Sequence, residues 1–213
     1  MNATWSELDK GTERLILVGP ALKKVLSSSL LDAAGLASVP QLAVDGGGHF
    51  AVNPVLWAGD GDSGTPPERT PVFFKHDQNL TDLRFCLNGI HDWRWKELHL
   101  FGFLGGRRDH ELANFGEIHA EMKMRPAFSK AIFYGEECHR QVLFLGAGEH
   151  TVELRGAFST LALEPAKVTV AGDCSYKAEN MLLSPLSGHG VSNEAAGVVK
   201  ISSSAPLMLL CNF

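Results

Sequence analysis

The pattern of apolar segments changes near residue 138, and this change most constrains the fold. Before it, short apolar runs typical of strands alternate with segments whose apolar residues recur at helical spacing. Alternating strands and helices predict a mostly parallel sheet with helices on its faces. The expected strands cover residues 14–19, 41–48, 54–64, 71–76, 97–103 and 130–135, and the expected helices cover 20–36, 81–90 and 109–124.

After residue 138 the apolar segments are short and are separated by Gly, Pro, Ser or charged residues. No segment there favours a helix. The pattern predicts a compact all-β sandwich. We therefore expect an α/β domain at residues 1–138 and a β-sandwich domain at 139–213. The expected strands of the second domain cover residues 140–146, 150–156, 158–164, 167–172, 197–202 and 205–213.

Composition excludes some classes of partner and leaves others. The chain has 213 residues, 45% of them hydrophobic, which suffices for a substantial core. A net charge of −5 with no long run of Lys or Arg gives no indication of nucleic-acid or membrane-surface binding. No apolar stretch is long enough to span a bilayer, and the N-terminus lacks the pattern of a signal peptide. The four scattered cysteines favour reduced thiols and a cytoplasmic protein: Cys86, Cys138, Cys174 and Cys211.

Acidic residues follow the expected strands of the first domain. In an open α/β sheet, ligands bind beyond the carboxyl ends of the strands, so we expect these side chains to converge on one edge. Crowded carboxylates repel one another, and a divalent cation such as Mg²⁺ removes that repulsion while binding phosphates. The acids are Asp45, Asp60, Asp62, Asp77, Asp82 and Asp109.

The segment GDGDSG at residues 59–64 has two interpretations. The first is a metal-binding loop, in which Asp60 and Asp62 lie on the same side and the glycines let the backbone approach a polyphosphate. The second is an ordinary solvated turn, because Gly and Asp are common turn residues. The other acidic positions favour the metal-binding interpretation.

Two further segments have the features of anion sites and helix starts. In LGGRRDH, at residues 104–110, two glycines precede a helix N-terminus, and Arg107 and Arg108 are suited to phosphate oxygens. Asp109 is a candidate either for chemistry or for the N-cap of that helix. In HDQNLTD, at residues 76–82, Thr81 or Asn79 is expected to cap the next helix. The helix dipole accounts for Asp82, but Asp77 and Gln78 have no evident local role.

The ordered set DGGG (45–48), GDGDS (59–63), DQNLTD (77–82), GGRRDH (105–110) and GHGVSNE (188–194) resembles the thiamine pyrophosphokinase family. The resemblance runs through nearly the whole chain. It implies an α/β domain that binds ATP, a β-sandwich domain that binds thiamine, and a homodimer with thiamine between the subunits. The implied reaction converts ATP and thiamine to AMP and thiamine diphosphate and requires Mg²⁺.

The resemblance also implies roles for particular residues. The family's metal and triphosphate acids correspond by this resemblance to Asp60, Asp62 and Asp82. Its nucleotide contacts correspond to Asp45, Gly46, Gly47, Gln78 and Thr81. Its second phosphate loop corresponds to Gly105, Gly106, Arg107 and the catalytic candidate Asp109. Its residues near the thiamine ring correspond to Tyr176, Ser192 and Asn193.

Several alternatives stay open. Tyr176 is either an aromatic that packs on thiamine or a core residue of the sandwich. The proton acceptor for the thiamine hydroxyl is either Asp109 or Asp62. Two other functions stay open besides that of a thiamine pyrophosphokinase. One is a diphosphotransferase for another hydroxymethyl heterocycle, such as a pterin, and the other is a non-catalytic nucleotide-binding module. Retention of GVSNE at residues 190–194 and of all the acidic positions favours the thiamine enzyme.

Overall fold

The computed structural model describes residues 3–135 and 139–212. It divides into two compact units, the first made of Met1–Glu117 with Phe133–His139 and the second of Ile118–Ile132 with Arg140–Phe213. The predicted domain boundary after residue 138, and Cys138 with it, lies outside the described residues. The domain roles expected from the sequence, nucleotide binding and thiamine binding, stay predictions.

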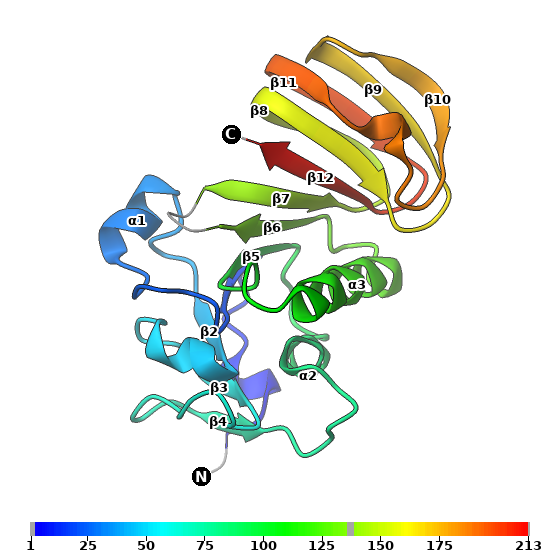
Figure 1. The fold of residues 1–213 in the computed structure, drawn as a ribbon. Helices are drawn as coiled ribbons and strands as arrows, with labels where there is room; N and C mark the ends of the chain where they lie inside the picture. Colours follow the sequence, from blue (N-terminus) through cyan, green and yellow to red (C-terminus); the bar gives the residue numbers. More distant parts are fainter. Residues whose placement is uncertain (1–2, 136–138, 213) are drawn as a thin grey trace. The chain divides into compact units, whose positions relative to one another are not determined.

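The first unit is built on parallel strands in the order β5-β1-β2-β3-β4 (Figure 1). Parallel strands with both faces covered consist of continuous apolar runs, and all four residues of β2 and of β3 are buried. This agrees with the expected parallel sheet. The strands are β1 (Arg14–Val18), β2 (Gln41–Val44), β3 (Leu56–Gly59), β4 (Val72–Phe74) and β5 (Glu97–Phe101), and β6 (Lys130–Tyr134) contributes its last two residues to this unit.

The helices of the first unit include two that the sequence predicted closely. They are α2 (Asp82–Gly89), which packs on β2 and β3, and α3 (Arg108–Met124), which continues into the second unit. Short 3-10 helices form at η1 (Ser6–Leu8) and η2 (Asp45–His49), and Figure 1 draws α1 (Ser28–Ala33) and α2 on opposite sides of the parallel strands.

The helix expected over residues 20–36 is shorter than predicted, because only residues 28–33 are helical. The backbone before it bonds elsewhere: Ala21 N donates to Gly102 O at 3.0 Å and Leu26 N to Phe50 O at 3.0 Å. Ser27 then caps the short helix, its hydroxyl accepting from Leu30 N. Leu26, Leu31 and Leu36 of this segment are buried, although only Leu31 of the three lies in the helix.

The second unit is antiparallel, in the order β10-β9-β11-β8-β12-β7. Two expected strands, 150–156 and 158–164, are one long strand, because Gly156 takes a φ of +84° and turns the chain without ending the ladder. Strand β10 was not predicted. The strands are β7 (Arg140–Leu145), β8 (Gly148–Ala162), β9 (Ala166–Cys174), β10 (Ala178–Leu183), β11 (Asn193–Ser203) and β12 (Leu207–Asn212), with η4 (Gly188–Gly190) before β11.

The pairing of β11 with β9 is irregular beside a glycine. The register of β11 against β9 shifts between Ala195 and Val199, opposite Gly172, whose φ is +97°. A bulge of this kind bends a sheet and increases its twist. A sheet so bent is compatible with layers that face each other, and the two-layer sandwich stays a prediction. In the described ranges, no helix has both the length and the apolar character that crossing a membrane requires.

Candidate functional site

The turn after β2 places the first acid. Asp45 is 2% exposed and has a φ of +43°, and its Oδ1 accepts a hydrogen bond from Gly61 N at 3.0 Å. Its carbonyl accepts from Trp57 Nε1 at 2.8 Å. A Cβ at Gly47 would lie 1.8 Å from Val18 O, so only glycine fits there. The DGG sequence thus forms a tight 3-10 turn that presses against β1 and fixes the Asp45 carboxylate.

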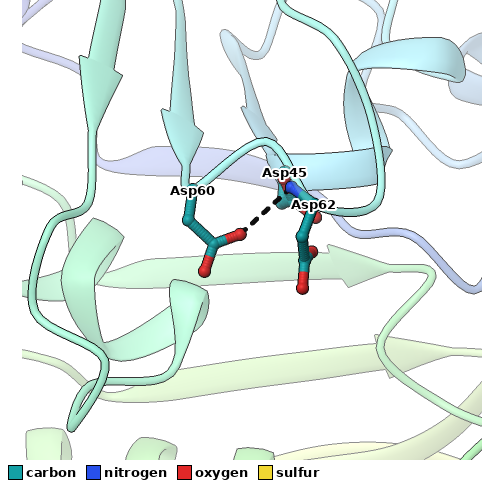
Figure 2. Close-up of side chains that lie close together, drawn as sticks. All are labelled: Asp45, Asp60 and Asp62. Carbon is teal, nitrogen blue, oxygen red and sulfur yellow. Dashed lines mark hydrogen bonds between the residues drawn. The ribbon is translucent and has the colours of Figure 1, made fainter.

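The loop after β3 brings two more acids beside Asp45. Asp62 N donates to Asp60 Oδ1 at 3.2 Å, and Ser63 Oγ donates to Asp62 Oδ1 at 2.9 Å. Figure 2 shows the three carboxylates together, with the bond between Asp62 and Asp60 dashed. One oxygen from each of Asp45, Asp60 and Asp62 lies within 4.8 Å of the others. This grouping contains two of the three metal ligands that the sequence predicted.

The third predicted metal ligand, Asp82, lies beside a residue that the sequence analysis missed. Lys75 follows β4, and its side chain is 5% exposed. Its Nζ lies 2.9 Å from Asp60 Oδ2 and 3.2 Å from Asp82 Oδ1, and it donates to Leu80 O at 3.0 Å. A lysine two residues before Asp77, at the end of an apolar run, was the signal in the sequence. Buried ammonium groups need partners of this kind.

Charge and burial act in opposite directions within this cluster. The hydrogen bond from Lys75 lowers the pKa of Asp60, against the effect of burial. Burial raises the pKa of Asp82, and Lys75 offsets only part of the rise. Burial alone would lower the pKa of Lys75, but the two carboxylates prevail and raise it. Lys75 is therefore a cation at neutral pH.

The residues at the start of α2 have the capping roles that the sequence predicted. Thr81 is the N-cap, and its Oγ1 accepts from Arg84 N at 3.0 Å. Asp77 Oδ1 accepts from the backbone and side-chain amides of Asn79, both at 2.9 Å. Asp77 therefore closes an Asx turn, a local role that the sequence analysis did not find. Gln78 is exposed and lines the cavity described below.

The second loop lies between β5 and α3. Gly105 and Gly106 have φ of +80° and +72°, and Gly105 N donates to Glu111 Oε2 at 2.7 Å. That amide therefore already holds a carboxylate where an anion site was expected. Glu111 was not singled out from the sequence. Because α3 begins at Arg108, Asp109 lies in its first turn and not at the residue that precedes it.

Arg107 and Asp109 form an exposed ion pair. Arg107 Nη2 donates to Asp109 Oδ2 at 2.5 Å, and Nε donates to Oδ1 at 3.2 Å. The guanidinium lowers the pKa of Asp109 to about 2. A carboxylate with so low a pKa is a poor proton acceptor near neutral pH. The pair leaves Arg107 71% exposed.

A cavity of about 590 Å³ joins these segments within the first unit. It brings together most of the site residues predicted for this unit: Asp45, Asp60, Asp62, Gln78, Thr81, Asp82, Gly105, Gly106 and Arg107. Lys75, His110, Glu111 and Asn114 also line it. Gly46, Gly47 and Asp109 do not line it, although they belong to the segments that do.

The second unit has a smaller cavity, of about 250 Å³, beside the predicted thiamine residues. Tyr176 and Asn193 line it, whereas Ser192 does not. Tyr176 is 71% exposed, so the interpretation of it as a core residue is wrong. Asn193 holds its backbone, with Oδ1 accepting from Tyr176 N at 2.9 Å and Nδ2 donating to Tyr176 O at 2.7 Å. Ser192 N donates to Ser159 Oγ at 3.1 Å.

Comparison with known proteins identifies the fold. No protein-family model matches the chain, and no curated protein matches it. Among solved structures, thiamine pyrophosphokinase from Bacillus subtilis is similar with a TM-score of 0.74 and 20% identity, over 94% of this chain and 99% of that one. The enzyme from Geobacillus thermodenitrificans gives 0.70 and 22%, over 94% and 98%.

A eukaryotic structure agrees with the bacterial ones. Yeast thiamine pyrophosphokinase is similar with a TM-score of 0.70 and 14% identity, over 97% of this chain and 89% of that one. The resemblance found in the sequence is therefore confirmed at the level of the fold. The chain has the mixed α/β fold of the thiamine pyrophosphokinases of known structure.

Proposed function

We propose that this protein is a thiamine pyrophosphokinase, which transfers the diphosphoryl group of ATP to the hydroxyl of thiamine. The observation that carries the proposal is the cavity of the first unit, where three acids from two strand ends face a Gly-Gly-Arg loop. This combination suits a metal-bound triphosphate. The shared fold supports it, because the structures from three organisms carry that name.

The donor set of the cavity fits Mg²⁺. Asp45, Asp60 and Asp62 offer hard carboxylate oxygens within 4.8 Å of one another, and Mg²⁺ is usually held by a few carboxylates together with phosphates and water. The chain itself supplies one cation to this cavity, because the Lys75 ammonium pairs with Asp60. When bound, Mg²⁺ would neutralise phosphate charge and orient the transferred group.

The residues of the chain would act mainly by positioning and by charge. Arg107 is exposed toward solvent and would exchange its pairing with Asp109 for phosphate oxygens. Gly105 N would exchange the Glu111 carboxylate for a phosphate in the same way. Gln78 and Thr81 line the cavity and would contact the nucleotide.

In the reaction one phosphorus–oxygen bond forms and one breaks, and the hydroxyl gives up its proton. The thiamine oxygen bonds to the β-phosphorus of ATP, while the bond from that phosphorus to the oxygen bridging it to the α-phosphate breaks and AMP leaves with that oxygen. The hydroxyl proton passes to a carboxylate and then to solvent. Asp62 suits this step better than Asp109, because Asp62 lines the cavity and Asp109 does not.

Recognition of thiamine belongs to the second unit in this proposal. The exposed ring of Tyr176 would pack on the thiamine ring, while Asn193 fixes the Tyr176 backbone and Ser192 flanks it. Exposed aromatics such as Tyr176 supply large contact area at low entropic cost.

The protein would act as a homodimer that binds thiamine between subunits, an arrangement that sedimentation of the purified chain tests.

The test is AMP release by the purified protein with ATP, Mg²⁺ and thiamine. AMP that requires both Mg²⁺ and thiamine, with matching thiamine diphosphate, supports the proposal. A folded protein that binds Mg-ATP but releases no AMP with thiamine overturns it. A hydroxymethyl pterin offered in place of thiamine then tests the other diphosphotransferase. Binding without turnover on either acceptor indicates a nucleotide-binding module.

A further inference from the structure

The loop between β5 and α3 has an amide that a carboxylate already engages. Gly105 N donates to Glu111 Oε2 at 2.7 Å, and both residues line the cavity of the first unit. We propose that Glu111 sets the affinity of this loop for phosphate, because its carboxylate occupies the amide that a phosphate oxygen would otherwise take. Glu111 is then an internal competitor of the substrate. Only the identity of that phosphate rests on the proposed function.

The bond between Glu111 and Gly105 is not the ordinary cap of a helix. In a capping box, the acid is the third residue of the helix and reaches back to the residue just before it. Here α3 begins at Arg108, so Glu111 is its fourth residue and Gly105 is the third residue before it. Glu111 N donates to Arg107 O at 3.1 Å, as the helix requires, while the side chain reaches past the helix start. The carboxylate therefore engages the loop and not the end of the helix.

The space beside the loop is open on the side where side chains would lie. Gly105 and Gly106 have φ of +80° and +72°, and a Cβ added to either would meet no atom of the described chain within 4 Å. Packing therefore does not keep a phosphate away from these glycines. What a phosphate must displace at Gly105 is the Glu111 carboxylate.

Charge makes the two anions mutually exclusive at this amide. One N–H provides a single strong hydrogen bond, and two anions that share it lie close enough to repel each other. The positive end of the α3 dipole favours either anion, so it does not decide between them. The apparent affinity for phosphate therefore falls in proportion to the fraction of molecules in which the amide is free.

Asp109 acts differently from the same helical turn. Its carboxylate pairs with Arg107, and both acids lie in the first turn of α3. Glu111 lines the cavity, whereas Asp109 does not. A phosphate in the cavity can draw Arg107 away while Asp109 stays in place, but at Gly105 the carboxylate itself has to leave. Glu111 is therefore the acid whose removal should strengthen phosphate binding most.

The test uses inorganic triphosphate with Mg²⁺, so neither thiamine nor turnover enters. Binding to the purified full chain is measured by calorimetry. If Glu111 variants bind triphosphate as expected while the unmodified chain releases no AMP with thiamine, the proposed function fails and this inference stands. If AMP is released and the variants bind triphosphate no more tightly, the inference fails and the proposed function stands.

Two substitutions separate occupancy of the amide from charge. Glu111→Gln keeps the size and removes the charge, and should tighten triphosphate binding by about tenfold, the scale of a hydrogen bond to a charged group. Glu111→Asp keeps the charge but is shorter by one methylene, so it does not reach Gly105 N and should also tighten binding. Unchanged or weaker binding in either variant overturns the inference, as does the absence of binding to every form of the chain. Glu13→Gln is the matched control and should leave the affinity unchanged, since Glu13 pairs with Lys96 just before β1, at the other end of the strands.

Nuclear magnetic resonance gives an independent readout of the exchange. In the unmodified chain, triphosphate should shift the carboxyl-carbon resonance of Glu111, because the carboxylate leaves the Gly105 amide. In Glu111→Gln, the Gly105 amide proton should move upfield before triphosphate is added, because its charged acceptor is lost. A Glu111 carboxyl resonance that does not respond to bound triphosphate contradicts the proposal.

Discussion

The two cavities hold their side chains in different ways. In the first unit, Asp45 is 2% exposed and Lys75 is 5% exposed, and backbone amides and ion pairs fix their positions. In the second unit, Tyr176 is 71% exposed, and only its backbone is fixed, through Asn193. The first arrangement is suited to localised charge, which requires fixed partners. The second offers a flat apolar surface that a ring can cover.

This difference has an energetic consequence. Removing a buried charge in the first cavity leaves its partners uncompensated, which is costly. Removing an exposed ring in the second leaves nothing unpaired and costs only the contact with the ligand. Substitutions of the buried charges in the first cavity should therefore abolish chemistry or folding, whereas substitutions in the second cavity should weaken the binding of one substrate.

The strongest test replaces Asp60, which belongs to the carboxylate group with Asp45 and Asp62 and also pairs with Lys75. Asp60→Asn should lower AMP release by about a hundredfold or more, the scale for loss of one electrostatic contact to a transition state, with the fold intact. Steady-state AMP release and circular dichroism measure the two quantities. Asp32→Asn, at an exposed position in α1, is the control. Near-normal turnover, or loss of folded protein, would count against the role of Asp60.

The rigidity of the first site is tested at Gly47. Gly47→Ala would place a Cβ 1.8 Å from Val18 O, and we expect a loss of about 3 kcal/mol or more in unfolding free energy. Gly116→Ala is the matched control, because it lies in α3 with no atom within 4 Å of the new Cβ, and should stabilise by about 1 kcal/mol. Urea denaturation compares the two variants. If both changes were equally tolerated, the DGG turn would not be rigid.

The sequence predicted the first unit better than the second for a physical reason. Parallel strands are buried on both faces, so each is a continuous apolar run that ends at a polar loop. That is why the acids at the ends of β2 and β3 were found together. The strands of the second unit vary in length and bend at glycines, so 150–156 and 158–164 were separated although Gly156 continues the strand.

The parts of the site that the sequence missed depend on long-range contacts. Lys75 has no motif of its own, and its role comes from Asp60 and Asp82, which are 15 and 7 residues away in the sequence. Glu111 acts through the amide of Gly105 across the turn that opens α3. The sequence analysis found no local role for Asp77, because its Asx turn with Asn79 is a local hydrogen bond that the residue types allow but do not require.

The exposed site of the second unit is tested at Tyr176. Tyr176→Ala should raise the KM for thiamine by about fivefold, as loss of an aromatic contact of about 1 kcal/mol implies, and leave the KM for ATP unchanged. Tyr176→Phe keeps the ring and should behave as the unmodified protein does. Kinetics at varied thiamine and varied ATP separate the two constants. A fall in stability with Tyr176→Ala would show that this ring is structural, and the contrast between the sites would be lost.

The smallest effect concerns the exposed pair of Arg107 and Asp109, which lies in the first unit but is held as loosely as Tyr176. The pKa of Asp109 is lowered to about 2. The stability that this contributes is fully present at pH values above the ordinary carboxyl range and is lost as the pH falls through about 2. Both side chains are exposed, so this contribution is small. Arg107→Ala should return the Asp109 pKa to the ordinary range, measured by NMR titration of the carboxyl carbon, with almost no change in unfolding at pH 7. A large loss of stability would show that this pair is part of the rigid framework. It would then not be free to exchange its partner for a phosphate, and the Arg107 contact in the proposed reaction would have to be abandoned.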